Sequence, residues 1–204
     1  MQNFFLHPSL RTKPLGSECV GPVQKILPAC RSSGITIIWL NWGVLNQDLP
    51  LLPPSHTRVF HEDGLSGIGS KISTRWGRLL MHGSRNAALY PPLQEEFHKG
   101  LEMGTDHWVN KNRMSGLWGR STELAHFLES RDISALIFAG VGADQSIPGT
   151  FVDAYSRGYD CVMLKDAVIR NNGEPNTQPV NYNAGMSYGF VTDTTRLLES
   201  LRQS

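Results

Sequence analysis

The sequence has little of several features that would assign a protein to a class at once. Its three cysteines are too few and too scattered for a disulfide framework or a zinc site. The 19 basic and 18 acidic side chains leave a formal charge of +1, which gives no electrostatic footprint for nucleic acid. No apolar run approaches the roughly 20 residues that a membrane-spanning helix needs. We therefore expect no nucleic-acid partner and no membrane partner.

Leader and ligand-binding signatures are missing as well. The opening MQNFFLHPSLRTKP shows neither the basic leader nor the apolar core of a signal peptide, which predicts a cytoplasmic location. The segment GVGADQ begins like a dinucleotide loop, but Gln145 stands where the third glycine would be, and there is no GxxxxGK[ST] phosphate loop. The seven histidines show no metal-ligand spacing. We therefore expect no metal and no cofactor.

The most informative stretch that is present runs from residue 134 to residue 167. Residues 135–141 and 161–164 are apolar without polar alternation, as in strands buried on both faces of a parallel sheet. Between them, residues 146–157 have a helical pattern that ends at a glycine. Ligands of open parallel sheets bind beyond the carboxyl ends of the strands, so this pattern places residues 142–146 at the functional edge.

The other segments alternate in the same way. Their patterns predict strands at 35–42, 107–111 and 188–191, and helices at 17–32, 121–131 and 194–201. This alternation predicts an α/β fold: a doubly wound, mainly parallel sheet with helices on both faces, in a single domain of residues 1–204. Residues 1–16 are predicted to form a loop. The Pro- and Gly-rich residues 43–74 are predicted to form a long loop or lid, with a disordered insertion as the alternative.

A few side chains at the predicted carboxyl edge are candidates for chemistry. Ser146 is either a helix cap or a reacting group, because serine is a preferred capping residue everywhere. Lys111 ends a predicted strand, where it is either a surface lysine or a buried base with a lowered pKa. The amides of Gly142 and Ser146 are candidate donors to an oxyanion. Trp42 and Trp118 are candidate walls of a substrate-binding pocket.

Four segments carry a resemblance to a known family: ITIIWLNWG, HWVNKNRMSGLWG, AGVGADQSIPGTFVDAYSRGYDCVMLKDA and YNAGMSYGF. They resemble the isochorismatase-like hydrolases, which include nicotinamidases and N-carbamoyl amide hydrolases, and most closely a fungal-type subgroup. The resemblance implies a role in secondary metabolism. It places the family's catalytic lysine on Lys111 and its nucleophile position on Ser146. It also implies oxyanion-binding amides beside a cis peptide bond between Val141 and Gly142.

The chain departs from the family pattern in two places. The family's thiol hydrolases attack with a cysteine, but Ser146 stands there, and a serine hydroxyl is far less ionised near neutral pH. The family's aspartate base ends a first strand just before a Met-Gln-Asn turn, whereas here that turn is residues 1–3. The resemblance therefore implies that the first, central strand is missing. We expect either an internal start, with an upstream strand in the natural product, or a real truncation closed around the gap.

Three functions are compatible with these observations. The first is an isochorismatase-like hydrolase that acts on a small amide, ester or enol ether. The second is a catalytically inactive homologue that binds a small molecule in the old pocket. The third is a structural partner of an intact homologue, because an exposed apolar seam favours homo- or hetero-oligomers. The residues leave all three open.

Overall fold

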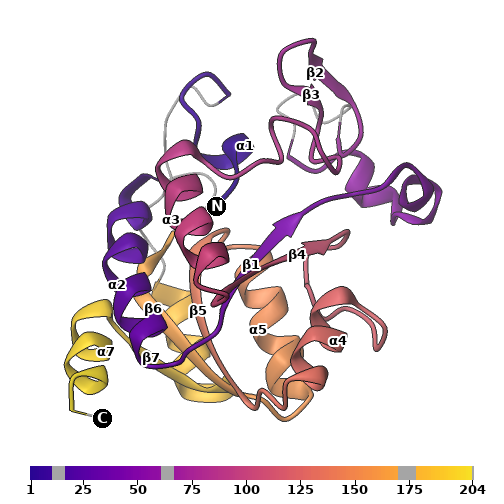
Figure 1. Ribbon diagram of the computed structural model, residues 1–204. Coiled ribbons are helices and arrows are strands. Elements are labelled where there is room, and N and C mark those ends of the chain that lie inside the picture. Colours follow the sequence, from indigo (N-terminus) through magenta and orange to yellow (C-terminus); the bar gives the residue numbers. More distant parts are fainter. Residues whose placement is uncertain (11–16, 61–66, 170–177, 204) are drawn as a thin grey trace.

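The computed structural model of the protein describes residues 1–10, 17–60, 67–169 and 178–203 (Figure 1). Its centre consists of parallel strands arranged in two sheets. One sheet has the order β1-β4, the other has the order β5-β6-β7, and β2 and β3 form a small antiparallel hairpin. The strands are β1 (Ile37–Trp42), β2 (Lys71–Ser73), β3 (Gly77–Arg78), β4 (Asp106–Lys111), β5 (Ala135–Val141), β6 (Asp160–Ile169) and β7 (Phe190–Thr192).

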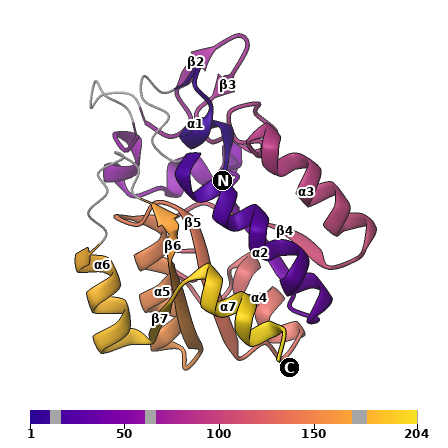
Figure 2. The ribbon, with the colours of Figure 1, turned by 90° about the vertical axis from the view of Figure 1, so that its left-hand side faces the viewer.

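Helices cover both faces of these strands (Figure 2). On one face lie α2 (Val20–Ser32), α3 (Pro91–Glu102) and α7 (Thr194–Leu201), and on the other lie α4 (Glu123–Ser130) and α5 (Ser146–Ser156). Shorter elements are α1 (Asn3–Leu6), η1 (Ser17–Cys19), η2 (Asn46–Leu51), η3 (Pro54–Thr57), α6 (Gln178–Asn183) and the π-turn η4 (Ala184–Tyr188). The predicted α/β class, with parallel sheets flanked by helices, is confirmed.

The strand β1 shows why the apolar runs have no polar alternation. Its residues Ile38 and Leu40 pack into the cluster under α4 and α5, whereas Ile37 and Trp39 pack into the cluster under α2, α3 and α7. Successive side chains of a strand point to opposite faces, and both faces of this strand are covered by helices. Apolar residues are therefore favoured on both faces, as at positions 37–40.

Helix ends follow the local chemistry of the sequence. The Thr122 hydroxyl accepts a hydrogen bond from the Ala125 amide at 3.1 Å and caps α4, and Gly158 takes φ +89° just beyond α5. The predicted loop of residues 1–16 is partly wrong, because Asn3–Leu6 form one helical turn. Its residues 11–16, and residues 61–66 of the predicted lid, lie outside the described part.

The long segment 43–74 packs against the body of the protein. Its Leu52 and Ile68 join a third apolar cluster with Phe4 and Trp42, beside the 3-10 turns η2 and η3. This packing gives the described part of the segment a fixed position near the carboxyl end of β1. A role as a lid stays a prediction.

A buried ion pair joins α2 to the start of β4. Arg31 donates two hydrogen bonds to the carboxylate of Asp106, at 2.9 and 2.8 Å, and the Trp39 indole donates a third at 2.7 Å. Arg31 also bonds Glu96 of α3 at 3.0 Å. Burial alone would raise the pKa of Asp106, but the hydrogen bonds from Arg31, Trp39 and Thr105 outweigh it and hold the pKa below its usual range.

We predict that Asp106→Ala lowers the free energy of unfolding by about 3 to 5 kcal/mol, because it leaves the Arg31 guanidinium buried with a single carboxylate partner. Chemical denaturation at neutral pH measures the change. Glu95→Ala is the control: Glu95 is exposed and pairs only with the exposed Lys99, so its loss should cost less than about 1 kcal/mol. Equal effects of the two variants would contradict a structural role for the Asp106 network.

Candidate active site

An apolar cavity of about 540 Å³ lies between β1 and β5. All residues of both strands line it, together with apolar side chains of α2 and α5. Lys111 and Ser146 reach the cavity near the carboxyl ends of the strands, the edge at which open parallel sheets bind ligands. Among the described residues, no carboxylate lines this cavity. The site therefore places the Lys111 amine and the Ser146 hydroxyl in largely apolar surroundings.

Lys111 is the last residue of β4, paired in register with Trp42 of β1. Its side chain is buried, so the surface-lysine alternative is wrong. Its Nζ donates to the Met114 carbonyl at 2.5 Å and lies 4.7 Å from the centre of the Trp42 ring. Burial lowers the pKa of Lys111 from 10.5 to about 7, because the charged form loses its hydration. A large fraction of Lys111 is therefore neutral at physiological pH.

Ser146 is the first residue of α5. The cap position belongs to Gln145, and the Ser146 hydroxyl lies 3.7 Å from the Met114 sulfur, so the prediction that Ser146 caps the helix is wrong. Met114 thus contacts both candidates, through its carbonyl for Lys111 and through its sulfur for Ser146. The amide of Ser146 belongs to the first turn of a helix, where amides have no intrahelical acceptor. The structure therefore brings Lys111 and Ser146 into contact with one shared residue, Met114.

The Gly142 amide has a different role from the one expected. It donates to the Ile169 carbonyl of β6 at 2.8 Å, and the Ala143 amide donates to the same oxygen at 3.0 Å. Gly142 takes φ +105°, a conformation that glycine adopts without strain. The described residues contain no cis peptide bond, so the expectation of one between Val141 and Gly142 is wrong. Because its hydrogen is already bonded to Ile169, the Gly142 amide is not aimed at the cavity in this structure.

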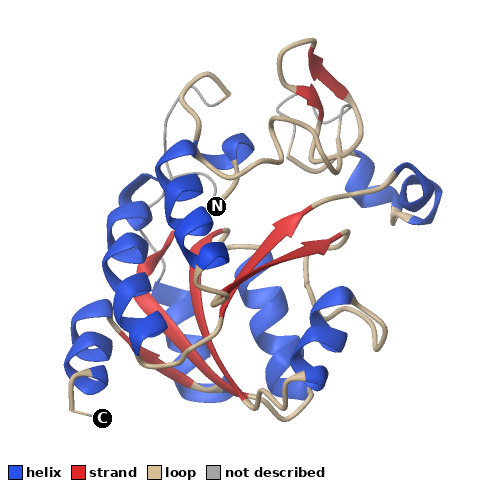
Figure 3. Ribbon diagram, in the orientation of Figure 1, coloured by secondary structure: helices blue, strands red, loops and turns tan. Residues whose placement is uncertain are grey.

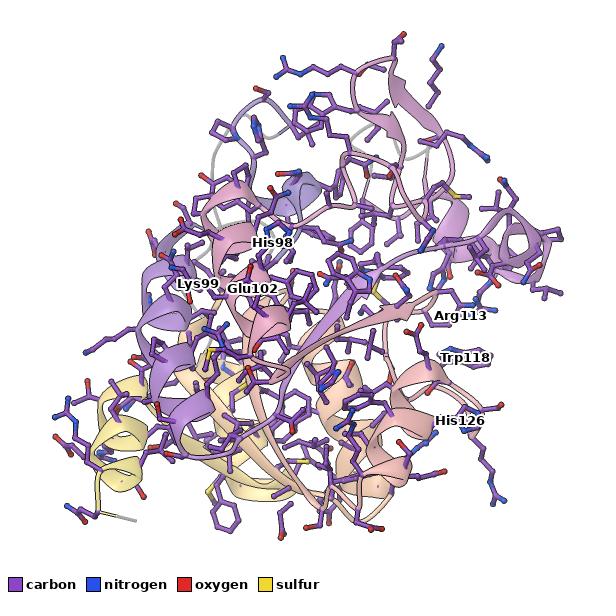
Figure 4. All side chains as sticks on the ribbon, in the orientation of Figure 1. His98, Lys99, Glu102, Arg113, Trp118 and His126 are labelled. Atoms are coloured by element: carbon purple, nitrogen blue, oxygen red, sulfur yellow. The ribbon has the colours of Figure 1, made fainter. Side chains whose placement is uncertain are left out.

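The two tryptophans lie in different surroundings. Trp42 is buried and lines the cavity beneath the Lys111 ammonium. Trp118 is 52% exposed, does not line the cavity, and stacks with the Arg113 guanidinium at 4.8 Å (Figure 4). The structure therefore brings Trp42 together with Lys111 and places Trp118 on the outer surface beyond β4. A substrate-binding role for Trp118 stays a prediction.

Three neighbours of the site were not identified from the sequence. Met114 has no chemical signature, although its place three residues after Lys111 in a Ser-Gly turn lets the chain fold back. Gln2 bonds both backbone groups of Trp42, which only the three-dimensional pairing reveals. His56 packs against the Trp42 ring, and its Nε2 is buried without a hydrogen-bond partner in the described part. Burial, with the charges of Arg113 and Lys111, lowers the pKa of His56.

The described residues show neither a metal-binding cluster nor a membrane-spanning helix. Within residues 1–10, 17–60, 67–169 and 178–203, no three histidine, cysteine or acidic side chains gather as a metal site would require. Over that part of the chain, no helix combines the length and the apolar character needed to cross a bilayer.

The fold and the carboxyl-edge site define an α/β protein of the kind that binds small molecules at the end of a parallel sheet. The sequence pattern of the isochorismatase domain matches residues 1–195, so the chain belongs to the isochorismatase family. It is therefore a member of a hydrolase family, as the resemblance of the four segments indicated.

Solved structures agree at the level of the fold. A cysteine hydrolase from Pseudomonas syringae pv. phaseolicola 1448A aligns with a TM-score of 0.75 and 19% identity, over 100% of this chain and 89% of that one. An N-carbamoylsarcosine amidase from Thermoplasma acidophilum aligns at 0.67 and 23%, over 95% and 92%. A nicotinamidase from Bacillus subtilis aligns at 0.69 and 20%, over 94% of both chains. At these identities the likeness shows the fold alone.

We predict that Lys111→Met stabilises the protein in a pH-dependent way. Between pH 7 and pH 10.5 the unfolded chain binds a proton on Lys111 that the folded chain lacks, so the stability of the unmodified protein rises with pH over this window. The variant lacks this dependence. Its free energy of unfolding should exceed that of the unmodified protein by on the order of 4 kcal/mol at pH 7, reduced by the energy of the lost contacts with Met114 and Trp42. This difference should shrink towards pH 10.

Urea unfolding of both proteins from pH 7 to pH 10 measures the difference. Lys165→Met is the matched control, because Lys165 is about half exposed and pairs with Asp193 at 3.5 Å. If the difference in free energy of unfolding between Lys111→Met and the unmodified protein stays constant with pH, Lys111 keeps its ordinary pKa.

Proposed function

We propose that the chain is a hydrolase of small amides or esters, in which neutral Lys111 is the base and Ser146 is the nucleophile. The observation that carries this proposal is the burial of Lys111 beside Ser146 in a cavity lined by no carboxylate among the described residues. A neutral amine is then the base that the site itself supplies. Membership of a hydrolase family supports the reaction class, and two of the solved structures of the same fold are amidases by name.

The proposed steps use only these groups. Lys111 takes the proton of Ser146 while the Ser146 oxygen attacks the carbonyl carbon of the substrate. The developing oxyanion is stabilised by the amide of Ser146 at the start of α5, where the helix dipole favours negative charge. Lys111 then returns the proton to the leaving amine or alcohol. Water, activated by the same lysine, hydrolyses the acyl-serine and restores the site.

The surroundings favour a small and largely apolar substrate. The Trp42 ring and the apolar residues of β1 and β5 line most of the cavity, so a charged substrate would lose much of its hydration there. Neutral amides and esters meet this requirement. An enol ether, which is cleaved with acid assistance, would instead require the protonated form of Lys111 as the proton donor.

We predict that Lys111→Ala and Ser146→Ala each lower kcat/KM by about 10²-fold to 10⁴-fold, the usual contribution of a base or nucleophile to the rate. Ammonia release from primary amides and colour release from 4-nitrophenyl esters provide the measurements. For the unmodified protein, kcat/KM should rise with pH through about 7, where Lys111 loses its proton.

His126→Ala is the control for this series, because His126 is exposed on the outer side of α4, where its ring bonds the exposed Ser121 hydroxyl (Figure 4). It should leave kcat/KM unchanged. Ester hydrolysis that persists at full rate in Ser146→Ala would overturn the serine as nucleophile. A rate that rises as the pH falls would instead point to acid cleavage of enol ethers.

A second function is ligand binding without turnover. It is favoured by the Gly142 amide, which bonds Ile169 and so leaves an oxyanion with fewer donors. In that case a small amide should bind, as measured by calorimetry, with no product formed after long incubation. Lys111→Met would then change the affinity alone.

The setting of the activity follows from the family resemblance. We infer a single-domain cytoplasmic protein of fungal-type secondary metabolism that works without a cofactor. Association into homo- or hetero-oligomers is supported by the exposure of Ile137 in the middle of β5, since large apolar side chains in the middle of a strand are usually covered.

We predict that Ser146→Cys creates a thiol that reacts faster with iodoacetamide than the three native cysteines. A helix start lowers the pKa of a thiol, and the neutral Lys111 amine can accept the thiol proton. By contrast, burial raises the pKa of Cys19 and of Cys161 to about 11 and raises that of Cys30 above its usual value. Peptide mapping after brief alkylation at pH 7.5 identifies the modified residue. Modification no faster than that of the native thiols would contradict an electropositive, accessible site at position 146.

A further inference from the structure

We propose that Thr150 is a positioning residue of the site: its hydroxyl holds the loop after β4 against α5 and so fixes where the Lys111 amine meets the Ser146 hydroxyl. The roles of these two groups as base and nucleophile rest on the proposed function, whereas the contacts of Thr150 do not. Thr150 lies about one turn after Ser146 on α5, is 3% exposed, and lines the same cavity as Lys111 and Ser146.

The Thr150 hydroxyl joins two segments that are distant in the sequence. It accepts a hydrogen bond from the Gly116 amide at 3.1 Å and donates one to the Ser146 carbonyl at 2.9 Å. The bond to Ser146 is common for a threonine within a helix. The bond from Gly116 reaches 34 positions back along the chain, to the loop that joins β4 to α4 (Figure 3). One hydroxyl therefore ties this loop to the first residue of α5.

The tied loop carries the residue that the base and the nucleophile share. Met114 lies two positions before Gly116, and its carbonyl accepts from the Lys111 Nζ at 2.5 Å. Its sulfur lies 3.7 Å from the Ser146 hydroxyl. Because only Ser115 separates Met114 from Gly116, a displacement of Gly116 would displace Met114 with it. The position of Met114 between Lys111 and Ser146 therefore depends on the Thr150 bond.

The surroundings of Gly116 show why its amide needs this partner. A Cβ at Gly116 would stand 2.8 Å from the Leu40 side chain and 2.9 Å from that of Leu124, so the backbone fills a slot without room for a side chain. Gly116 is buried. A buried amide without an acceptor costs free energy comparable to a lost hydrogen bond. The Thr150 oxygen supplies the acceptor, and removing it would favour a loop position in which the amide meets water.

A second contact holds the far end of the loop. Arg157, at the end of α5, donates to the Leu117 carbonyl at 2.6 Å and to the Gly119 carbonyl at 2.5 Å. The loop therefore has one anchor at each end of the helix. The Thr150 anchor is the one that acts on the carbonyl of Ser146, so its loss should alter the site while Arg157 keeps the loop attached.

A change of this kind should affect the reaction more than the binding of substrate. A base must lie within hydrogen-bond reach of the proton that it takes, directly or through one water. A misplacement of about 1 Å can lower a rate by about 10²-fold. Movement of Met114 would also admit water to Lys111, and hydration of the ammonium raises the lysine pKa towards its usual value.

The test compares two substitutions of Thr150 with one elsewhere on α5. Thr150→Val removes the hydroxyl at nearly the same volume, and Thr150→Ser keeps the hydroxyl. Ser156→Ala is the matched control, because Ser156 is exposed and donates to the Val152 carbonyl of its own helix at 2.8 Å, four positions back as for Thr150. Hydrolysis of a 4-nitrophenyl ester gives kcat and KM. Titration of the lysine Cε carbon-13 signals gives the midpoint of Lys111.

We expect Thr150→Val to lower kcat by about 10-fold to 10²-fold with KM within twofold, and to move the Lys111 midpoint upwards from about 7. Thr150→Ser should rescue kcat to within about threefold and restore the midpoint, and Ser156→Ala should change neither. A lower Tm of Thr150→Val with unchanged kcat and midpoint would show a structural role alone and overturn the proposal. If the unmodified protein hydrolyses nothing, the proposed function fails, and the midpoint alone decides the role of Thr150.

A second measurement keeps the proposal testable if Thr150→Val does not fold. Hydrogen exchange at the Gly116 amide is followed by NMR in the unmodified protein, in Thr150→Ser, and in a free peptide of residues 112–120. We expect exchange in both proteins to be at least a hundredfold slower than in the peptide. Exchange at the rate of the peptide would show that Thr150 does not hold the loop and would overturn the proposal.

Discussion

The structure depends on a requirement of parallel sheets: a strand in the interior must find hydrogen-bond partners on both of its edges. β1 and β5 meet this requirement on one edge each, through β4 and β6. The other two edges face each other across the cavity, which is why a space of about 540 Å³ lies in the middle of the strand layer. The burial of Lys111 at one end of this space follows from the same arrangement.

The chemistry of the site follows from that burial. Lys111 is taken out of water and receives one backbone acceptor and one aromatic ring, but no carboxylate among the described residues. An ammonium in such surroundings is less stable than an amine, so the pKa falls towards neutrality. In the proposed reaction, this amine is the base for the hydroxyl of Ser146, which contacts the same Met114. Lys111 then has the role that the resemblance assigns to the family's aspartate.

Much of the fold could be predicted because local sequence patterns indicate its helices and strands. The limits of β5 agree with the predicted 135–141, and α4 lies within the predicted helix 121–131. Apolar runs without alternation correctly indicated strands covered on both faces for β1 and for residues 161–164 of β6, whereas alternate residues of β5, at positions 135, 137 and 139, are exposed. What the sequence could not show was the pairing of these strands into two separate sheets, because partner choice depends on contacts far apart in the chain.

The site was predictable in its residues but less so in its geometry. Lys111 was found from its place at a strand end, and the structure buries it. Two expected roles were wrong. The Gly142 amide does not face the cavity, because it bonds Ile169, 27 positions further along the chain. Ser146 does not cap α5, because Gln145 takes the cap position. His56 and Gln2 reach Trp42 only through the folding of distant segments. Such contacts leave no periodic signal in a single sequence.

The central claim is that Lys111 is buried and neutral beside Ser146, and its own titration tests this claim most directly. The protein would be labelled with carbon-13 at the lysine Cε, and the Lys111 signal would be identified from its loss in Lys111→Met. The account predicts a chemical-shift midpoint near pH 7, well separated from those of the other lysines. A midpoint near 10.5 would show a hydrated ammonium at neutral pH and would contradict both the base and the arrangement of the cavity that creates it.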